Sequence, residues 1–140
     1  MKVYLSIPMI ANRALDRANL MAKAIRDSGN QVASPWVLGA LENPNRSVTN
    51  IFLRDKGGVE ESDAIVADVT EPSIGVGMEL MAAYNSGKRI VIVAKKGRVT
   101  SRMLDHMDKK EILEYEAESE IYQGLMRVLR KPQRFSSQPI

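Results

Sequence analysis

The chain has 140 residues, a formal net charge of +3 and no cysteine. This length fits one domain, which we expect over residues 1–130. The absence of cysteine excludes a disulfide framework, a thiolate metal site and a cysteine nucleophile, as is typical of a cytoplasmic protein. No apolar run is long enough to cross a membrane, and the 20 lysines and arginines are scattered among 17 acidic residues, which disfavours a membrane or nucleic-acid partner.

Short apolar runs alternate with helical patterns along the chain. Strands are predicted near residues 2–8, 31–33, 64–69, 89–94 and 112–113. The first helix is predicted between a cap at Asn12 and a stop at Gly29, and the second runs from a cap at Ser47 toward Gly57 and Gly58. Further helices are predicted over 78–86, over 103–107 and around residues 121–128. Residues 131–140, with two prolines and two serines, are expected to form a flexible tail.

This alternation predicts an α/β protein with a three-layer, doubly wound fold of the flavodoxin-like or Rossmann-like kind. The five strands would form a parallel sheet in the order 2-1-3-4-5. Strands one and three would then lie side by side, and a ligand site is expected where the strand order reverses. Four polar side chains would converge there: Tyr4, Ser6, Ser73 and Glu79.

The stretch from Thr70 to Gly77 follows the third strand and mixes proline, serine and glycine. Gly75 and Gly77 do not complete a dinucleotide fingerprint, and no P-loop lysine follows them. A loop of backbone amides and a serine hydroxyl before a helix can hold one phosphate, although a plain tight turn explains the pattern equally well. The helix after it is expected to have an apolar face made of Met78, Met81, Ala82 and Ala83.

Several acidic residues are candidates for chemistry. Glu79, expected in the first turn of its helix, is either a cap or an ionised nucleophile or general base. Asp55 is either its partner or an ordinary surface acid, and Asp68, inside an apolar strand, must be paired or reach the cleft. His106 is the only histidine, so no transition-metal site is expected, and nothing in the sequence requires a cofactor.

The segment from Asp68 to Leu80 carries the pattern Thr-x-Pro-Ser-x-Gly-x-Gly-x-Glu. Together with Val3-Tyr4-Leu5 before it and Gly97-Arg98-Val99-Thr100-Ser101 after it, the segment resembles the 2'-deoxynucleoside 5'-phosphate N-hydrolases, relatives of the nucleoside 2-deoxyribosyltransferases. The resemblance extends from Val3 to about Arg130.

The resemblance implies that Glu79 attacks the anomeric carbon of deoxyribose and forms a glycosyl ester that water cleaves. It also implies that Asp55 handles the proton of the leaving base and that Tyr4 hydrogen-bonds near the nucleophile. A retaining glycosidase of this kind needs two carboxyl groups about 5 Å apart, one of them the nucleophile.

Ser73 distinguishes the hydrolases from the transferases, which carry a carboxylate at this position. A carboxylate would repel a 5'-phosphate, whereas Ser73, Gly75, Gly77 and the helix amides suit one. Ser101 matches a serine that reaches the phosphate in the neighbouring subunit's site, which implies a homodimer. This chain departs from the family pattern after strand one: Gly-Ser-Ile-Arg-Gly is replaced by residues 6–13, where Ser6, Asn12 or Arg13 could take over phosphate binding.

The sequence therefore predicts hydrolysis of the N-glycosidic bond of 2'-deoxyribonucleoside 5'-monophosphates, without metal or organic cofactor. Two alternatives remain open: deoxyribosyl transfer between bases, and a non-catalytic nucleotide-binding module in which Glu79 only caps its helix.

Overall fold

The computed structural model describes residues 1–9, 14–39, 50–98 and 101–133. Its sheet contains β1 (Lys2–Ser6), β2 (Gln31–Val32), β3 (Ala64–Asp68), β4 (Arg89–Lys95) and β5 (Glu111–Tyr115). All neighbouring pairs are parallel and the order is β2-β1-β3-β4-β5, which confirms the predicted topology.

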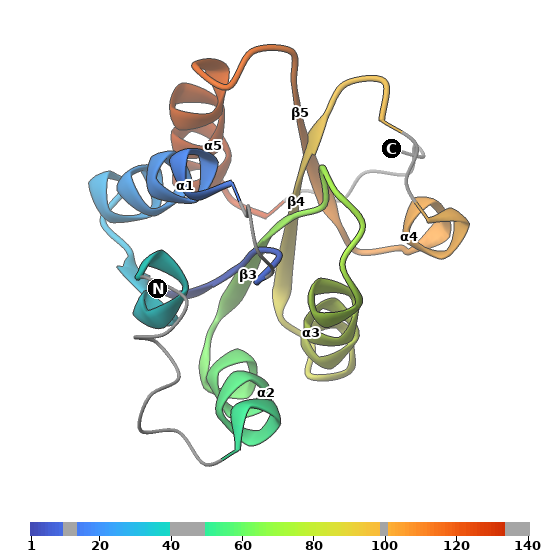
Figure 1. Cartoon of the computed structure of the whole chain (residues 1–140). Coiled ribbons are helices and arrows are strands. Elements are labelled where there is room, and N and C mark those ends of the chain that lie inside the picture. The colour runs from blue at the N-terminus through green and yellow to red at the C-terminus, as the bar shows by residue number, and fades with distance from the viewer. Residues whose placement is uncertain (10–13, 40–49, 99–100, 134–140) are drawn as a thin grey trace.

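The helices cover both faces of the sheet (Figure 1). One face carries α1 (Leu15–Asp27) and α5 (Glu120–Arg130), which pack against each other, and the other carries α2 (Ile51–Glu61) and α3 (Ile74–Asn85). A 3-10 turn, η1 (Pro35–Leu38), follows β2, and a short helix, α4 (Arg102–His106), lies between β4 and β5.

Side-chain alternation along the strands divides the core into two layers. Val3 and Leu5 point toward α1 and α5, whereas Tyr4 points toward α2 and α3 with Ile65 of the neighbouring strand. Because successive residues of a strand face opposite sides of the sheet, Ser6 shares the face of Tyr4. The sequence of β1 therefore sends two hydroxyl groups toward α3 near the carboxyl end of the strand.

Helix α3 begins earlier than predicted. It starts at Ile74, and Ser73 is its N-cap, with the Ser73 hydroxyl accepting a hydrogen bond from the amide of Val76 at 3.3 Å. Gly75 and Gly77 thus belong to the helix and not to a preceding loop. The cap satisfies one of the amides that a helix start leaves without a partner, which allows a glycine-containing turn to be helical.

The apolar face expected on α3 is divided between the core and the surface. The core-facing residues are Val76, Leu80 and Ala83, and in this chain Met78 and Met81 are 53% and 41% exposed. An earlier helix start brings Val76 onto the buried face, and the helical spacing of three to four residues then extends that face to Leu80 and Ala83.

Two other helix starts also differ from the prediction. Asn50 caps α2 by accepting from the amide of Leu53 at 3.0 Å, whereas Ser47 lies outside the described residues. Helix α2 continues past Gly57 and Gly58 to Glu61. For α1 the N-cap is Ala14 and not Asn12, which also lies outside the described residues.

The predicted end of α1 at Gly29 agrees with the structure. Gly29 follows α1 with a positive φ of 86°, as expected for a helix stop. The predicted tail lies largely outside the description, which ends at residue 133. Within the described residues, none of the helices has the length and apolar character needed to cross a membrane.

Candidate active site

The carboxylate of Glu79 lies where β1, α2 and α3 meet. Ser6 donates a hydrogen bond to its Oε1 at 2.9 Å, and the Tyr4 hydroxyl donates to its Oε2. Tyr4 and Ser6 are buried, and Glu79 itself is half-buried. The alternation of β1 thus delivers both donors to one acid, and the carboxylate is held by both of its oxygens.

Glu79 lies in the second turn of α3, because the helix begins five residues before it. The expectation that it lies in the first turn was therefore wrong, and Ser73, not Glu79, caps the helix. A capping role does not explain the carboxylate, and the helix dipole acts mainly within the first turn.

The surroundings of Glu79 favour its neutral form. Burial raises the pKa of Glu79 from the ordinary value of 4.5 to about 7. The hydrogen bonds from Tyr4 and Ser6 act in the opposite direction, the charge of Asp55 raises the pKa further, and that of Arg54 lowers it. The same carboxylate and burial raise the pKa of Tyr4, so its hydroxyl remains a donor. Perturbed acids of this kind are typical of catalytic sites.

Asp55 comes from α2 and is close enough to affect the charge of Glu79. Arg54 donates to Asp55 Oδ1 from its Nε at 2.7 Å, and its guanidinium carbon lies 4.7 Å from the centre of the Trp36 ring. Trp36 in turn meets the ring of Tyr4 edge to face, with ring centres 6.2 Å apart. A chain of contacts therefore links Asp55 to Tyr4 around the acid.

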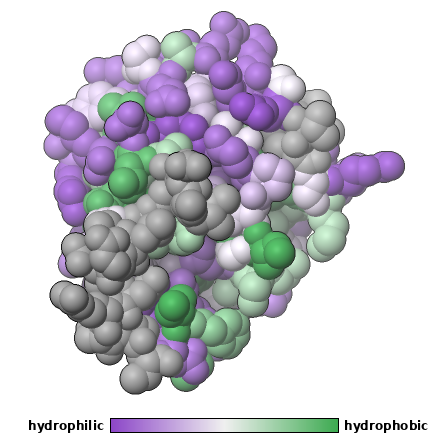
Figure 2. All heavy atoms as spheres, in the orientation of Figure 1, coloured by the Kyte–Doolittle hydropathy of each residue, from purple (hydrophilic) through white to green (hydrophobic). Residues whose placement is uncertain are grey.

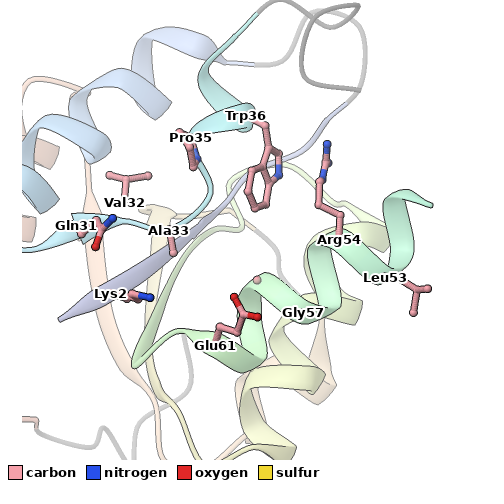
Figure 3. Close-up of a pocket in the computed structure, with 11 residues that line it drawn as sticks. Lys2, Gln31, Val32, Ala33, Pro35, Trp36, Leu53, Arg54, Gly57 and Glu61 are labelled. Carbon is pink, nitrogen blue, oxygen red and sulfur yellow. The ribbon is translucent and has the colours of Figure 1, made fainter. Parts of the chain in front are cut away.

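Trp36 and Arg54 also form one end of a cavity of about 560 Å³ between η1, β1 and α2 (Figure 3). The cavity extends from there toward the amino end of the sheet. That part is lined by Glu61 at the end of α2, Lys2 at the start of β1 and Gln31 at the start of β2. Trp36 is thus a wall residue of this cavity.

Gly58 allows α2 to approach the site. A Cβ atom added there would lie 2.9 Å from Cε2 of Tyr4 and 3.4 Å from the Trp36 ring. No such contact arises at the adjacent Gly57, where a Cβ atom would have nothing within 4 Å. Glycine at position 58 is therefore a steric requirement of the Tyr4 packing.

Three of the residues expected to hold phosphate, Ser73, Gly75 and Gly77, lie at the start of α3. Ser73 accepts from Val76, and its hydroxyl proton remains available to a ligand. Gly75 is exposed, whereas the amide of Gly77 donates to the carbonyl of Ser73 at 3.2 Å and is used inside the helix. The amide of Gly77 is therefore not available to a ligand. Because glycine has no side chain, Gly77 can still help a ligand to bind by leaving the helix surface open at this position.

Ser101 lies at the N-cap of α4, where it accepts from the amide of Met103 at 3.2 Å. It lines a groove of about 1270 Å³ between α3 and α4, together with Ser73, Gly77 and the exposed methionines of α3. Hydrophobic surface gathers over this part of the molecule among otherwise hydrophilic residues (Figure 2). Ser101 therefore lies in the same groove as Ser73. Within one chain, it takes no part in the hydrogen bonds to Glu79 described above.

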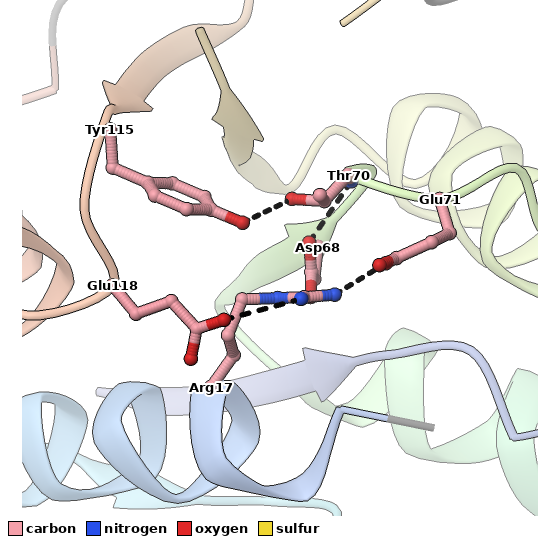
Figure 4. A network of polar contacts seen from close by, with 6 residues as sticks. All are labelled: Arg17, Asp68, Thr70, Glu71, Tyr115 and Glu118. Atoms are coloured by element: carbon pink, nitrogen blue, oxygen red, sulfur yellow. Dashed lines mark hydrogen bonds and ion pairs between the residues drawn. The ribbon is translucent and has the colours of Figure 1, made fainter. Parts of the chain in front are cut away.

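Asp68, which had to be paired or reach the cleft, is paired. Its Oδ2 accepts from Nε of Arg17 at 2.9 Å (Figure 4). The sequence analysis did not identify Arg17, Arg54 or Gly58 as site residues. Arg54 could have been suspected from its position beside Asp55, but no local signal marks the other two, because their partners are distant in sequence. Among the described residues, no group of three His, Cys, Asp or Glu side chains could hold a metal ion.

Comparison with known proteins identifies the family. The family model described as nucleoside 2-deoxyribosyltransferase matches residues 3–130. A Thermofilum pendens protein provisionally named 2'-deoxynucleoside 5'-phosphate N-hydrolase 1 is 34% identical over 104 residues, covering 72% of this chain and 73% of the relative. A protein of the same name from Methanococcoides burtonii is 31% identical over 108 residues, covering 74% and 88%.

Among solved structures, a CMP N-glycosidase from Clostridium botulinum has the same fold. Its TM-score is 0.66 at 19% identity, covering 89% of this chain and 98% of that protein. The likeness supports the fold, and the sequence match carries the assignment: the chain belongs to the nucleoside 2-deoxyribosyltransferase family.

Proposed function

We propose that the protein hydrolyses the N-glycosidic bond of 2'-deoxyribonucleoside 5'-monophosphates, with Glu79 as the nucleophile. The observation that carries this proposal is the half-buried Glu79 carboxylate, held by Tyr4 and Ser6 at the carboxyl edge of the sheet and electrostatically coupled to Asp55. The names of the two archaeal relatives support the same reaction and substrate class.

In the first step, a Glu79 oxygen bonds to C1' of the deoxyribose while the bond from C1' to the base nitrogen breaks. The electron pair of that bond leaves with the base, and Asp55 handles the proton that the base takes up. Tyr4 and Ser6 hold the carboxylate in line for attack, which is the contribution of a positioned nucleophile.

In the second step, a water oxygen bonds to C1' while the bond from C1' to the Glu79 oxygen breaks, and Asp55 takes up the proton that the water loses, giving 2-deoxyribose 5-phosphate and the free carboxylate. The base and the sugar phosphate are then the only products, and the configuration at C1' is retained. Because the attacking carboxylate must be ionised, the raised pKa of Glu79, about 7, means that the reaction slows as the pH falls below neutral.

The 5'-phosphate would bind at the start of α3, where Ser73 offers a hydroxyl and the first turn offers backbone amides. Gly75 and Gly77 leave this surface open. The positive end of the helix favours an anion there, and a serine avoids the repulsion that a carboxylate would cause.

The proposal includes a homodimer that joins two copies through the groove between α3 and α4. Ile74, Met78, Met81 and Met103 are large, exposed apolar side chains on this surface, 87%, 53%, 41% and 75% exposed in the single chain. Contact with a second copy would bury them, and it would bring Ser101 to the phosphate of the neighbouring site, as the family resemblance implies.

The test is release of free base from a panel of deoxynucleoside monophosphates, the matching deoxynucleosides and the matching ribonucleotides. Wild type is compared with E79Q and with a control, E60Q, whose exposed carboxylate on α2 forms an ion pair with Lys56. We expect release chiefly from deoxynucleoside monophosphates, lost in E79Q and kept in E60Q. Binding without release would favour a nucleotide-binding module, and new nucleotide formation with an added free base would favour a transferase.

A further inference from the structure

A cluster of polar side chains surrounds the buried Arg17 on the face of the sheet that α1 and α5 cover (Figure 4). Asp68 is buried with Arg17, whereas Glu71 and Glu118 are 43% and 51% exposed. Arg17 donates from Nε to Asp68 at 2.9 Å and from a terminal nitrogen to Glu71, and its other terminal nitrogen lies 3.7 Å from Glu118. Three segments that are far apart in the sequence therefore meet at one guanidinium.

The cluster also fixes the backbone after β3. Asp68 Oδ1 accepts from the amide of Thr70 at 3.0 Å, and the Thr70 hydroxyl shares a hydrogen bond of 2.8 Å with the Tyr115 hydroxyl. Asp68, Thr70 and Tyr115 are each buried. The first turn of the chain after β3 is thus tied to the sheet on one side and to Arg17 on the other.

The segment that this cluster holds leads directly to the start of α3. Glu71 is two residues before Ser73, which caps the helix and lines the surface proposed to receive the phosphate. Arg17 also fixes the position of the Glu71 carboxylate, because the guanidinium reaches it from α1. A guanidinium suits this role, since its planar fork can hold two carboxylates in fixed directions.

We propose that Arg17 is a positioning residue for recognition of the 5'-phosphate. By binding Asp68 and Glu71 together, Arg17 holds residues 69–72 in the path that places the Ser73 hydroxyl and the first amides of α3 against the phosphate. The inference rests on the proposed function, and it concerns a residue that acts through Ser73 and does not itself touch the substrate.

The chain offers a matched control at the other edge of the sheet. Arg89 donates to both carboxylate oxygens of Glu111, at 2.7 and 3.0 Å, and both side chains are about 9% exposed. These two residues begin β4 and β5, so the pair lies at the amino ends of the strands, away from α3's start. The Arg89 pair matches the Arg17 pair in chemistry and burial but lacks its connection to the β3–α3 segment.

The experiment compares wild type, R17K and R89K. For each protein, kcat/KM and the dissociation constant are measured with a deoxynucleoside 5'-monophosphate and with the corresponding deoxynucleoside. The phosphate preference is the value for the monophosphate divided by the value for the nucleoside, taken separately for kcat/KM and for the association constant. We expect R17K to lose about tenfold of this preference, mainly through KM of the monophosphate, because a lysine keeps the charge but cannot hold two carboxylates in the same geometry. R89K is expected to lose thermal stability and to keep the preference within about twofold.

A further variant, Y115F, keeps the experiment decisive if R17K fails to fold. It removes only the hydroxyl that anchors Thr70, and we expect it to lower the phosphate preference by about threefold. An unchanged preference in folded R17K, or in Y115F when R17K is unfolded, would overturn the positioning role, as would an equal loss in R89K.

The binding ratio separates this inference from the proposed reaction. A wild-type protein that releases no base but binds the monophosphate more tightly than the nucleoside would refute the hydrolase. The positioning role would then be judged from the loss of binding preference in R17K. A wild-type protein without any preference for the phosphate would refute the positioning role directly.

Discussion

The raised pKa of Glu79 makes a quantitative prediction about folding stability. Between the ordinary carboxyl pKa of 4.5 and the folded value of about 7, the folded chain binds a proton at Glu79 that the unfolded chain has already released. The free energy of unfolding therefore falls as the pH rises through this window, and it levels off above it. One pKa unit corresponds to about 1.4 kcal/mol, so the charged Glu79 costs the fold about 3 kcal/mol at pH 8.

The substitution E79Q removes this cost, because glutamine stays neutral at every pH. We expect E79Q to unfold at higher urea concentration than wild type at pH 8. The difference in unfolding free energy between the two proteins should grow by about 3 kcal/mol between about pH 4.5 and pH 8. Equilibrium urea unfolding at a series of pH values measures this growth, and subtracting the two proteins removes the contribution of every other titrating group.

The control for this measurement is E60Q, which removes an exposed carboxylate of the same chemistry. Its ion pair with Lys56 is exposed at both ends, so its removal should change the unfolding free energy by less than about 1 kcal/mol. A difference between E79Q and wild type that stays constant with pH, or that has the opposite sign, would refute the account of a carboxylate strained by burial.

Three further predictions concern the site. The acid limb of the pH dependence of kcat/KM should lie near pH 7, and Y4F should move it to higher pH, because the Tyr4 hydrogen bond lowers the pKa of Glu79; a limb that stays in place in Y4F would contradict this. G58A should lower the activity at least about tenfold and destabilise the fold by about 1–3 kcal/mol, whereas G57A should stabilise it by about 0.5–1 kcal/mol, as thermal unfolding and base release would reveal. S73D keeps a good helix cap but places a carboxylate at the proposed phosphate site, so KM for the monophosphate should rise at least about tenfold with little change for the nucleoside; equal effects on both substrates would argue against a phosphate at Ser73.

The strand order could be predicted because each strand is short, apolar and separated from the next by a helical pattern. The buried runs at 64–68 and 89–94 have no polar alternation, and such runs are typical of a central parallel sheet. From that order, the meeting of Tyr4, Ser6 and Glu79 follows, because alternation along β1 and the adjacency of β1 and β3 place them at one edge.

The start of α3 was harder to predict, because Pro72 and two glycines suggest a loop. Ser73 caps the helix at the first possible residue, and packing of Val76 and Leu80 against the sheet outweighs the cost of glycine in its first turns. The outward position of Met78 and Met81 follows from the same shift, and the sequence alone does not distinguish a buried methionine from an exposed one.

The contacts around Arg17 and Gly58 could not be predicted, since each depends on the three-dimensional approach of distant segments. Arg17 lies 51 residues from Asp68, and Gly58 matters only because α2 crosses the ring of Tyr4. Neither contact leaves a local pattern in the chain.

In the proposed reaction Glu79 forms a covalent bond to the sugar, and this bond can be trapped. Wild type and E79Q are mixed with a deoxynucleoside 5'-monophosphate that wild type hydrolyses, quenched in acid within one turnover, digested and examined by mass spectrometry. The account predicts a 2-deoxyribose 5-phosphate ester on the peptide that contains Glu79 in wild type and no adduct in E79Q. A burst of free base with the sugar attached to a different residue, or base release by E79Q at the wild-type rate, would contradict it.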